Sequence, residues 1–259
     1  MLRKIMAWYL HQLPFTDSRN YLHIKKFVKY LYGKRVLDVG CGDGNWSFIV
    51  SRFCKKVYGI DMNPKAHQIA RKKENINYLI ANGERIPFKN NSFDFIICTE
   101  VLEHIKDEKN IINEFKRILN YGGLIFISTP NKKYFETLDL SAYLKKITPP
   151  YLNWFFRWFV KYDVWKIKFG HLRDGYTFEE LEKKFDSFKP VKSYSKGGRS
   201  KFLLLQIYSC FSPPISLLLY PFYSFIEFLI EIKDRNAGMG LFLLLKKGGH
   251  NKFKKLLDI

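Results

Sequence analysis

The most regular feature of the chain is an alternation of short apolar runs with amphipathic stretches between about residues 34 and 131. Five runs have the length and composition of buried strands: 36–39, 57–60, 78–80, 95–98 and 124–127. Strands separated by helical stretches indicate βαβ units. We therefore expect an α/β fold with a Rossmann-like, doubly wound, mostly parallel sheet. Runs at 188–194 and 240–246 extend it to seven strands, with the last strand antiparallel.

Two helices are predicted outside this alternation. Between residues 19 and 32, apolar positions recur at helical spacing with lysines between them, and Gly33 ends the segment. Farther along, Thr177 is followed three residues later by Glu180. This spacing is a capping-box signal, which predicts a helix over 177–185.

Two segments depart from the pattern. Residues 151–168 interleave aromatic rings with Lys and Arg, and residues 202–226 contain no charged side chain but hold three prolines. The uncharged stretch is long enough to cross a bilayer, but its prolines argue against one straight helix and favour a broken or re-entrant hairpin. Both segments suit a membrane-facing lid, and a buried cap or a dimer interface is the alternative.

We expect a single domain over residues 1–259. Its parts are leading helices at 1–33, a cofactor-binding core at 34–131, an aromatic and basic lid insertion at 132–175, an apolar insertion at 200–236, and C-terminal strands and a helix at 176–199 and 237–250.

Charge and cysteine content narrow the partners and the compartment. The chain has 44 Lys and Arg against 24 Asp and Glu, a formal charge of +20. This excess favours anionic partners such as nucleic acid or an anionic membrane surface, or it reflects a biased genome. Four cysteines without paired spacing and the lack of a signal-peptide pattern predict a cytoplasmic protein, peripheral or monotopic if it contacts a membrane.

The strongest chemical motif follows the first strand, where Asp38 precedes Gly40, Gly42 and Gly44. Alternating glycines let the backbone turn sharply and approach a ligand. The pattern departs from the dinucleotide fingerprint Gly-x-Gly-x-x-Gly, since Asn45 follows the third glycine. An acid before the glycines pairs with a cationic amino group, whereas it would repel a pyrophosphate.

Residues 36–44 resemble motif I of the class I S-adenosylmethionine-dependent methyltransferases, which implies S-adenosylmethionine as the cofactor. In that family the acid at the end of the second strand, here Asp61, holds the ribose, and Met62 would pack on the adenine. Residues 80–88 resemble the third motif, with Asn82 in place of the usual Asp, and 91–97 and 119–124 resemble the next two motifs. The resemblance implies these cofactor-binding residues: Asp38, Gly40, Cys41, Gly42, Gly44, Asp61, Met62, Asn82, Gly83 and Thr99.

A possible metal site follows the fourth strand. If this segment is helical, Glu100, Glu103 and His104 lie on one face and suit Mg²⁺ or another divalent cation. The motif is similar to that of the ubiquinone-biosynthesis O-methyltransferases and of the small-RNA 2′-O-methyltransferases. His171 would be a fourth ligand or a base. Alternatively, Glu103 caps the helix and His104 packs in the core. The candidate catalytic bases are His104, His171 and Glu100.

These features predict O-methylation of a small-molecule acceptor that is lipophilic or lipid-linked, at a membrane surface. An RNA 2′-O-methyltransferase, or another nucleic-acid methyltransferase, is the alternative that the positive charge favours. A third hypothesis is a catalytically silent cofactor-binding partner protein, for which the replacement at Asn82 is the only hint.

Overall fold

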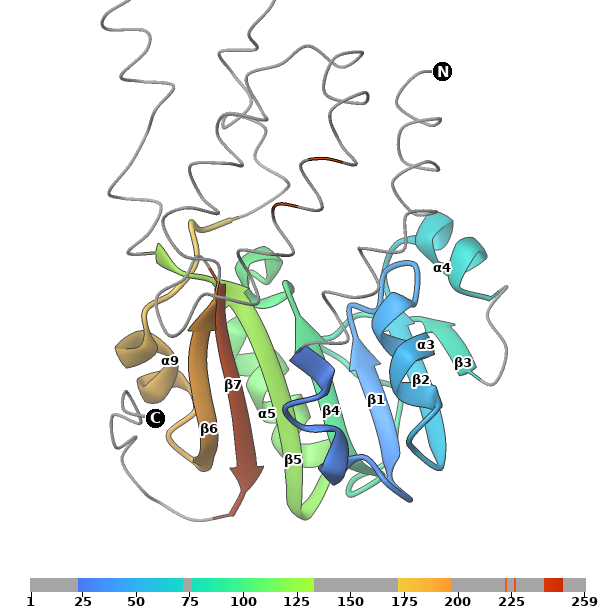
Figure 1. The fold of residues 1–259 in the computed structure, drawn as a ribbon, viewed down its shortest axis with the longest axis horizontal. Coiled ribbons are helices and arrows are strands. Elements are labelled where there is room, and N and C mark those ends of the chain that lie inside the picture. The colour runs from blue at the N-terminus through green and yellow to red at the C-terminus, as the bar shows by residue number, and fades with distance from the viewer. Residues whose placement is uncertain are drawn as a thin grey trace, which may run out of the picture.

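The fold is centred on one seven-stranded sheet (Figure 1). The computed structural model describes residues 23–71, 76–132, 172–196, 222, 226 and 240–248. The strands run in the order β3-β2-β1-β4-β5-β7-β6 across the sheet. Their bounds are β1 Arg35–Val39, β2 Lys56–Asp61, β3 Ile76–Ile80, β4 Phe93–Thr99, β5 Leu119–Pro130, β6 Phe188–Lys196 and β7 Gly240–Lys247.

Pairing in the sheet is parallel except at β7, which runs antiparallel to both β5 and β6. The strand order reverses between β1 and β4, since β2 and β3 lie to one side of β1 and β4 to the other. The predicted doubly wound, mostly parallel sheet with an antiparallel last strand is therefore confirmed.

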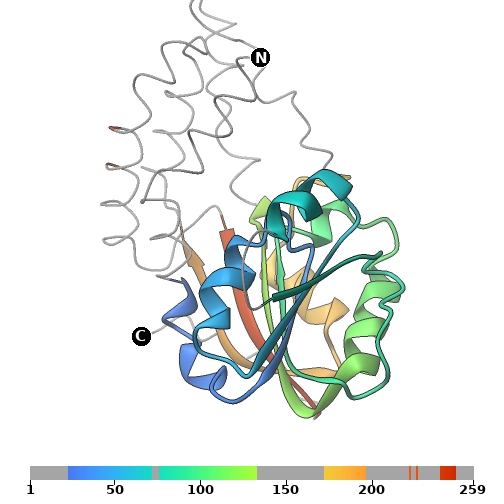
Figure 2. The ribbon, with the colours of Figure 1, turned by 90° about the vertical axis from the view of Figure 1, so that its right-hand side faces the viewer.

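Helices cover both faces of the sheet (Figure 2). The 3-10 helix η1 (Val28–Tyr30) and α3 (Asn45–Ser51) lie on one face, and α5 (Glu108–Ile118) and α9 (Phe178–Lys184) lie on the other. Helix α4 (Pro64–Ala70) packs beside β2 and β3, and a second 3-10 helix, η2 (Leu102–His104), follows β4.

Alternation along the strands builds a separate core on each face. In β4, Phe95 and Ile97 pack toward η1 and α3, whereas Ile96 and Cys98 pack toward α5 and α9. All four side chains are fully buried. Because both faces of a parallel sheet are covered, its strands are continuous apolar runs, the pattern that revealed them in the sequence.

The predicted leading helix is wrong over most of its described part. His23 and Ile24 are helical, but residues 25–32 form turns and the short η1 instead of a continuous α-helix that ends at Gly33. The apolar spacing was nevertheless a correct guide to burial, because Ile24, Phe27 and Leu31 are at most 1% exposed. Packing against β1 and β5 therefore determined which residues are buried without requiring a regular helix.

The predicted helix at 177–185 is confirmed by α9. The Thr177 side chain accepts a hydrogen bond from the Glu180 backbone N–H, and the Glu180 side chain accepts one from the Thr177 N–H. The insertions predicted at 132–175 and 200–236 lie almost wholly outside the described residues. None of the helices that the structure describes is long and apolar enough to cross a membrane.

Candidate cofactor site

The glycine loop between β1 and α3 forms a tight turn whose shape needs glycine. Gly40, Gly42 and Gly44 all have positive φ, at 69°, 52° and 78°. A Cβ on Gly40 would lie 2.3 Å from Cγ2 of Val101, and a Cβ on Gly44 would lie 2.2 Å from the Tyr78 hydroxyl oxygen. Around Gly42 no described atom lies within 4 Å of that position. The loop is therefore closely packed at both ends and open at its middle glycine, where a ligand can approach the backbone.

Strand β2 holds the loop through its last two residues. The N–H groups of Gly40 and Cys41 both donate to the Ile60 carbonyl, at 2.8 and 3.0 Å. The Asp61 carboxylate accepts from the Gly42 N–H at 2.9 Å and from the Asn63 N–H at 2.8 Å. Asp61 is thus fixed at the mouth of the loop, and each of its oxygens keeps a lone pair for a ligand hydroxyl.

Two further predicted cofactor residues flank Asp61. Met62 follows it and is 64% exposed, so its side chain is open to contact with a ligand ring. The Cys41 thiol is buried, and burial, together with the Asp38 and Asp61 carboxylates, raises its pKa well above the usual range. Cys41 therefore contributes its backbone N–H to the loop and carries no reactive thiolate.

Asp38 lies beneath the loop at 1% exposure. Its Oδ2 accepts a hydrogen bond of 2.6 Å from the Ser47 hydroxyl, whereas its Oδ1 is buried without a hydrogen-bond partner in the described part of the chain. Burial raises the pKa of this carboxyl from 3.8 to about 7. A buried acceptor without a donor is rare in folded proteins, and a cationic amino group is the donor that this carboxylate would favour.

The loop after β3 contains the next two predicted residues. The Asn82 Oδ1 accepts the Glu84 N–H at 2.8 Å, so the amide braces its own turn and its second lone pair remains for a ligand. A Cβ on Gly83 would lie 3.1 Å from Ile111 and 3.2 Å from Val39, so glycine permits close packing of this loop on α5 and β1.

Sequence reasoning missed the residues of α5 that hold this loop in place. The Arg117 guanidinium donates to the carbonyls of Ile86 and Phe88, at 2.9 and 2.7 Å. Glu114 accepts from the Ile86 N–H at 2.6 Å and pairs with Arg117. In the sequence the two residues are an ordinary pair at i and i+3, and only the tertiary packing shows that they bind another loop.

A second buried carboxyl lies at the carboxyl end of β4. Glu103 is completely buried, its Oε2 accepts from the Thr129 hydroxyl at 3.5 Å, and its Oε1 has no partner within the described ranges. Burial, and then the charge of Glu100, raises the pKa of Glu103 well above its usual range. Glu100 accepts a hydrogen bond of 2.8 Å from the Ser128 hydroxyl. Burial and the neighbouring carboxylate therefore favour the protonated form of Glu103.

The predicted helical metal face is wrong. Glu100 has a φ of 54°, and the segment continues as the three-residue η2, so Glu100, Glu103 and His104 do not lie on one α-helical face. The two glutamates turn toward β5, whereas His104 is exposed. No group of three His, Cys, Asp or Glu that suits a metal ion occurs among the residues that the structure describes. His171 lies outside them.

The remaining predicted residues converge on one edge of the sheet. Gly40, Asp61, Asn82 and Thr99 follow or end β1, β2, β3 and β4, all at the carboxyl ends of parallel strands. The strand order reverses between β1 and β4 at this edge. Ligands of open α/β sheets bind at such a switch point, so the geometry defines a cofactor-binding α/β protein.

Comparison with known proteins identifies the family. A family described as a methyltransferase domain matches residues 37–127. The ubiquinone biosynthesis O-methyltransferase of Actinobacillus pleuropneumoniae serotype 5b (strain L20) is 34% identical over 140 residues, which cover 49% of this chain and 60% of that protein. The enzyme of the same name from serotype 7 (strain AP76) is 30% identical over 183 residues, 63% of this chain and 77% of the relative.

Solved structures agree on the fold. The PH0226 protein from Pyrococcus horikoshii OT3 superposes with a TM-score of 0.57 at 13% identity, covering 91% of this chain and 92% of that one. A SAM dependent methyltransferase from Aquifex aeolicus gives 0.52 at 15% identity, covering 86% and 87%. The chain belongs to the class I S-adenosylmethionine-dependent methyltransferases. It spans 54% to 60% of the length of the first three curated relatives that it matches.

The family implies S-adenosylmethionine, and the site fits this cofactor. The unpartnered Asp38 Oδ1 suits a cationic amino group, the fixed Asp61 carboxylate suits a pair of hydroxyls, and the loop is open at Gly42. Glu103 is completely buried whereas Glu100 is exposed, and among the described residues no third ligand joins them to form a site for a divalent ion.

Proposed function

We propose that the chain transfers a methyl group from S-adenosylmethionine to the hydroxyl of a lipophilic or lipid-linked acceptor. The observation that carries the methyl-transfer part is the arrangement of Asp38, the glycine loop and Asp61 at the switch point of the sheet. The similarity to the two ubiquinone biosynthesis O-methyltransferases supports an oxygen acceptor.

The bound sulfonium supplies an activated methyl group, so the protein contributes mainly alignment. Asp61 would hold the ribose hydroxyls and Asp38 the amino group, which would orient the cofactor at the carboxyl ends of the strands. The Glu100 carboxylate, anchored by Ser128, lies at that strand end and would accept the proton that the acceptor hydroxyl loses. The acceptor oxygen would take the methyl group from sulfur, with S-adenosylhomocysteine as the leaving group.

The lipophilic acceptor is favoured by two stretches of sequence. Residues 202–226 are free of charged side chains, and residues 151–168 mix aromatic with basic residues as segments at a headgroup interface do. These stretches support a reaction at a membrane surface, with the protein bound there in a peripheral or monotopic manner.

The test is transfer of a radiolabelled methyl group by the full-length protein to three acceptors: a prenylated catechol in detergent, catechol itself, and purified RNA. The proposal predicts labelling of the prenylated catechol at least ten times faster than of catechol. Labelling of RNA alone would establish the nucleic-acid alternative. Binding of cofactor with no transfer to any broad acceptor panel would indicate the catalytically silent partner protein.

Glu100→Gln tests the proposed base separately. Because glutamine keeps the hydrogen bond from Ser128 but cannot take up a proton, kcat should fall at least tenfold with little change in cofactor affinity. An unchanged kcat and pH profile would remove Glu100 from the mechanism.

A further inference from the structure

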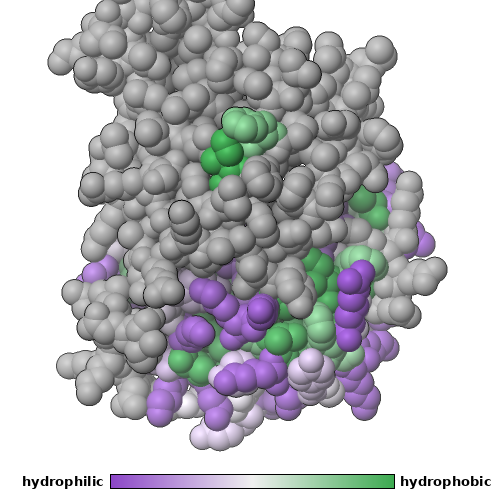
Figure 3. All heavy atoms as spheres, in the orientation of Figure 1, coloured by the Kyte–Doolittle hydropathy of each residue, from purple (hydrophilic) through white to green (hydrophobic). Residues whose placement is uncertain are grey.

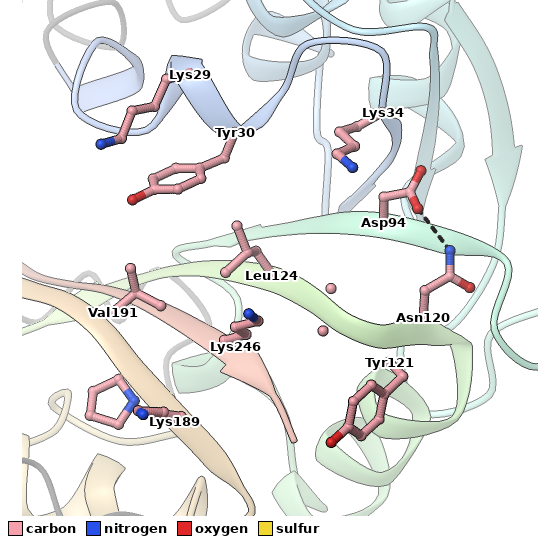
Figure 4. A pocket seen from close by; sticks show the side chains of 13 residues that line it. Lys29, Tyr30, Lys34, Asp94, Asn120, Tyr121, Leu124, Lys189, Val191 and Lys246 are labelled. Carbon is pink, nitrogen blue, oxygen red and sulfur yellow. Dashed lines mark hydrogen bonds between the residues drawn. The ribbon is translucent and has the colours of Figure 1, made fainter. Parts of the chain in front are cut away.

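A pocket of about 680 Å³ lies at the opposite edge of the sheet from the cofactor site (Figure 4). It is formed where β1, β4 and β5 begin, beside β6 and the end of β7. Asp94 in the pocket and Thr99 at the cofactor edge are five residues apart on β4, a separation of roughly 16 Å along the strand. The pocket is therefore not part of the methyl-transfer site.

The lining of the pocket is strongly basic. Four lysines contribute to it: Lys29, Lys34, Lys189 and Lys246. Its one carboxylate, Asp94, already accepts hydrogen bonds from the Arg35 N–H at 2.9 Å and from the Asn120 side chain at 2.8 Å. Within the part of the chain that the structure describes, none of the four ammonium groups forms a salt bridge. One carboxylate against four lysines leaves an excess of positive charge.

The ammonium groups come from different elements around one space. Figure 4 shows Lys34, from the segment before β1, close to Asp94, and Lys246, from β7, beside β5. The Lys246 stem lies over Gly122, where a Cβ would be 3.6 Å from its Cε. The stem of Lys246 therefore packs along the backbone of β5 while its side chain remains exposed to solvent at the pocket.

The rest of the lining is apolar or aromatic. Tyr30, Leu124, Pro190 and Val191 line the pocket, and Tyr121 stands at its rim with 87% exposure. Hydrophilic side chains gather along this lower rim of the molecule in Figure 3. Pockets of about 300–1,000 Å³ with apolar walls and a few convergent polar groups bind small molecules. The volume and lining of this pocket therefore suit a small molecule better than an extended polymer.

We propose that this pocket binds a small phosphorylated ligand, with Lys34 and Lys246 holding the phosphoryl oxygens and Tyr30 and Leu124 contacting its body. Lysine ammonium groups bind phosphate as point charges. The phosphoryl group belongs either to a free metabolite or to the headgroup of an anionic phospholipid. This site is independent of the proposed methyl transfer.

The test is calorimetric titration of the full-length protein with inorganic pyrophosphate and with a short-chain phosphatidic acid below its micelle concentration, at about 0.15 M salt. The pocket variant is Lys34→Gln with Lys246→Gln. Its matched control is Lys109→Gln with Lys183→Gln, which removes the same charge from exposed positions on α5 and α9. S-adenosylhomocysteine binding, expected to be equal in all three proteins, shows that each is folded.

Wild-type protein should bind at least one probe saturably, with at least tenfold weaker binding in the pocket variant and less than twofold change in the control. Tighter binding of pyrophosphate assigns a soluble ligand, and tighter binding of the lipid assigns a headgroup. Equal losses in both variants, or no saturable binding of either probe, would overturn the proposal, since both mean that only the overall charge attracts anions. If the wild-type protein does not bind S-adenosylhomocysteine, that result counts against the proposed function and not against the pocket.

Discussion

The three glycines of the cofactor loop share a positive φ but differ in what surrounds them. Gly40 lies against Val101 and Gly44 against Tyr78, whereas Gly42 faces open space. The first and third glycines are therefore required by packing within the protein, and the second by conformation and by the approach of a ligand. The sequence motif does not distinguish these roles of the three glycines.

Gly40→Ala should destabilise the protein by about 2–4 kcal/mol, since it adds a clash with Val101 to the strain of a positive φ. Gly33→Ala is the matched control, because Gly33 has a φ of 70° and no described atom within 4 Å of its Cβ position. We expect Gly33→Ala to lower the free energy of unfolding by about 1 kcal/mol and to leave the cofactor affinity unchanged. Urea unfolding of both variants measures the difference. Equal losses of stability in the two variants would show that Val101 can move away from the added methyl group without a cost in free energy.

Asp38 should make both stability and cofactor affinity depend on pH. Its pKa is about 7 in the folded protein against 3.8 when unfolded, so the folded state binds more protons between these values. Stability from this group therefore falls as pH rises from about 4 to 7, by up to about 4 kcal/mol. A cationic amino group prefers the ionised form, so S-adenosylmethionine should bind more tightly at pH 8 than at pH 6.

Asp38→Asn separates these effects. The variant should be more stable than the wild type at pH 8, and this gain should shrink by about 2 kcal/mol at pH 5. Its cofactor affinity should fall at least tenfold and lose its dependence on pH. Thermal unfolding and calorimetry at the two pH values provide the measurement. A wild-type affinity that stays constant from pH 6 to 8 would refute the predicted pKa of Asp38.

At the scale of elements, α5 positions the loop between β3 and β4 that carries Asn82 and Gly83. Arg117 satisfies two carbonyls of this loop with one planar guanidinium, a geometry that lysine cannot reproduce. Arg117→Lys should therefore cost about 1–3 kcal/mol of stability and weaken cofactor binding. Lys109→Arg, on the same helix, should change neither. Denaturant unfolding and calorimetry test both. An unchanged cofactor affinity in Arg117→Lys would show that the loop does not depend on α5.

The elements also show where sequence patterns fail. Strands β1 and β4 and the second half of β5 were predictable because burial on both faces makes each of them a continuous apolar run. The segment after β4 could not be predicted in this way. The Glu-x-x-Glu-His spacing suggested an α-helix that includes Glu100, but the positive φ of Glu100 prevents a helix from including it. In residues 25–32, the spacing of the apolar residues correctly indicated which side chains are buried, but it did not indicate the turns that replace the helix. In both cases the residue spacing predicted a helix, whereas the local conformation depends on tertiary packing.

At the scale of the whole molecule, the sheet carries two sites at its two edges. The candidate cofactor residues could be named from the sequence because they lie in four short motifs, each at or directly after the end of a strand, and the fold brings these strand ends together. The basic pocket was not, because its lysines come from segments as far apart as Lys29 and Lys246 and have no spacing that marks them. The net charge of +20 indicated an anionic partner without locating it.

The central claim is that the edge at the switch point binds S-adenosylmethionine. Titration of the full-length protein with S-adenosylhomocysteine at pH 8, alongside Asp61→Ala, tests it most directly. We predict one saturable site, with affinity at least tenfold weaker in the variant, because Asp61 anchors the loop at Gly42 and, in our account, would hold the ribose hydroxyls. A folded wild-type protein that binds no S-adenosylhomocysteine, or a variant that binds it equally well, would contradict this account of the site.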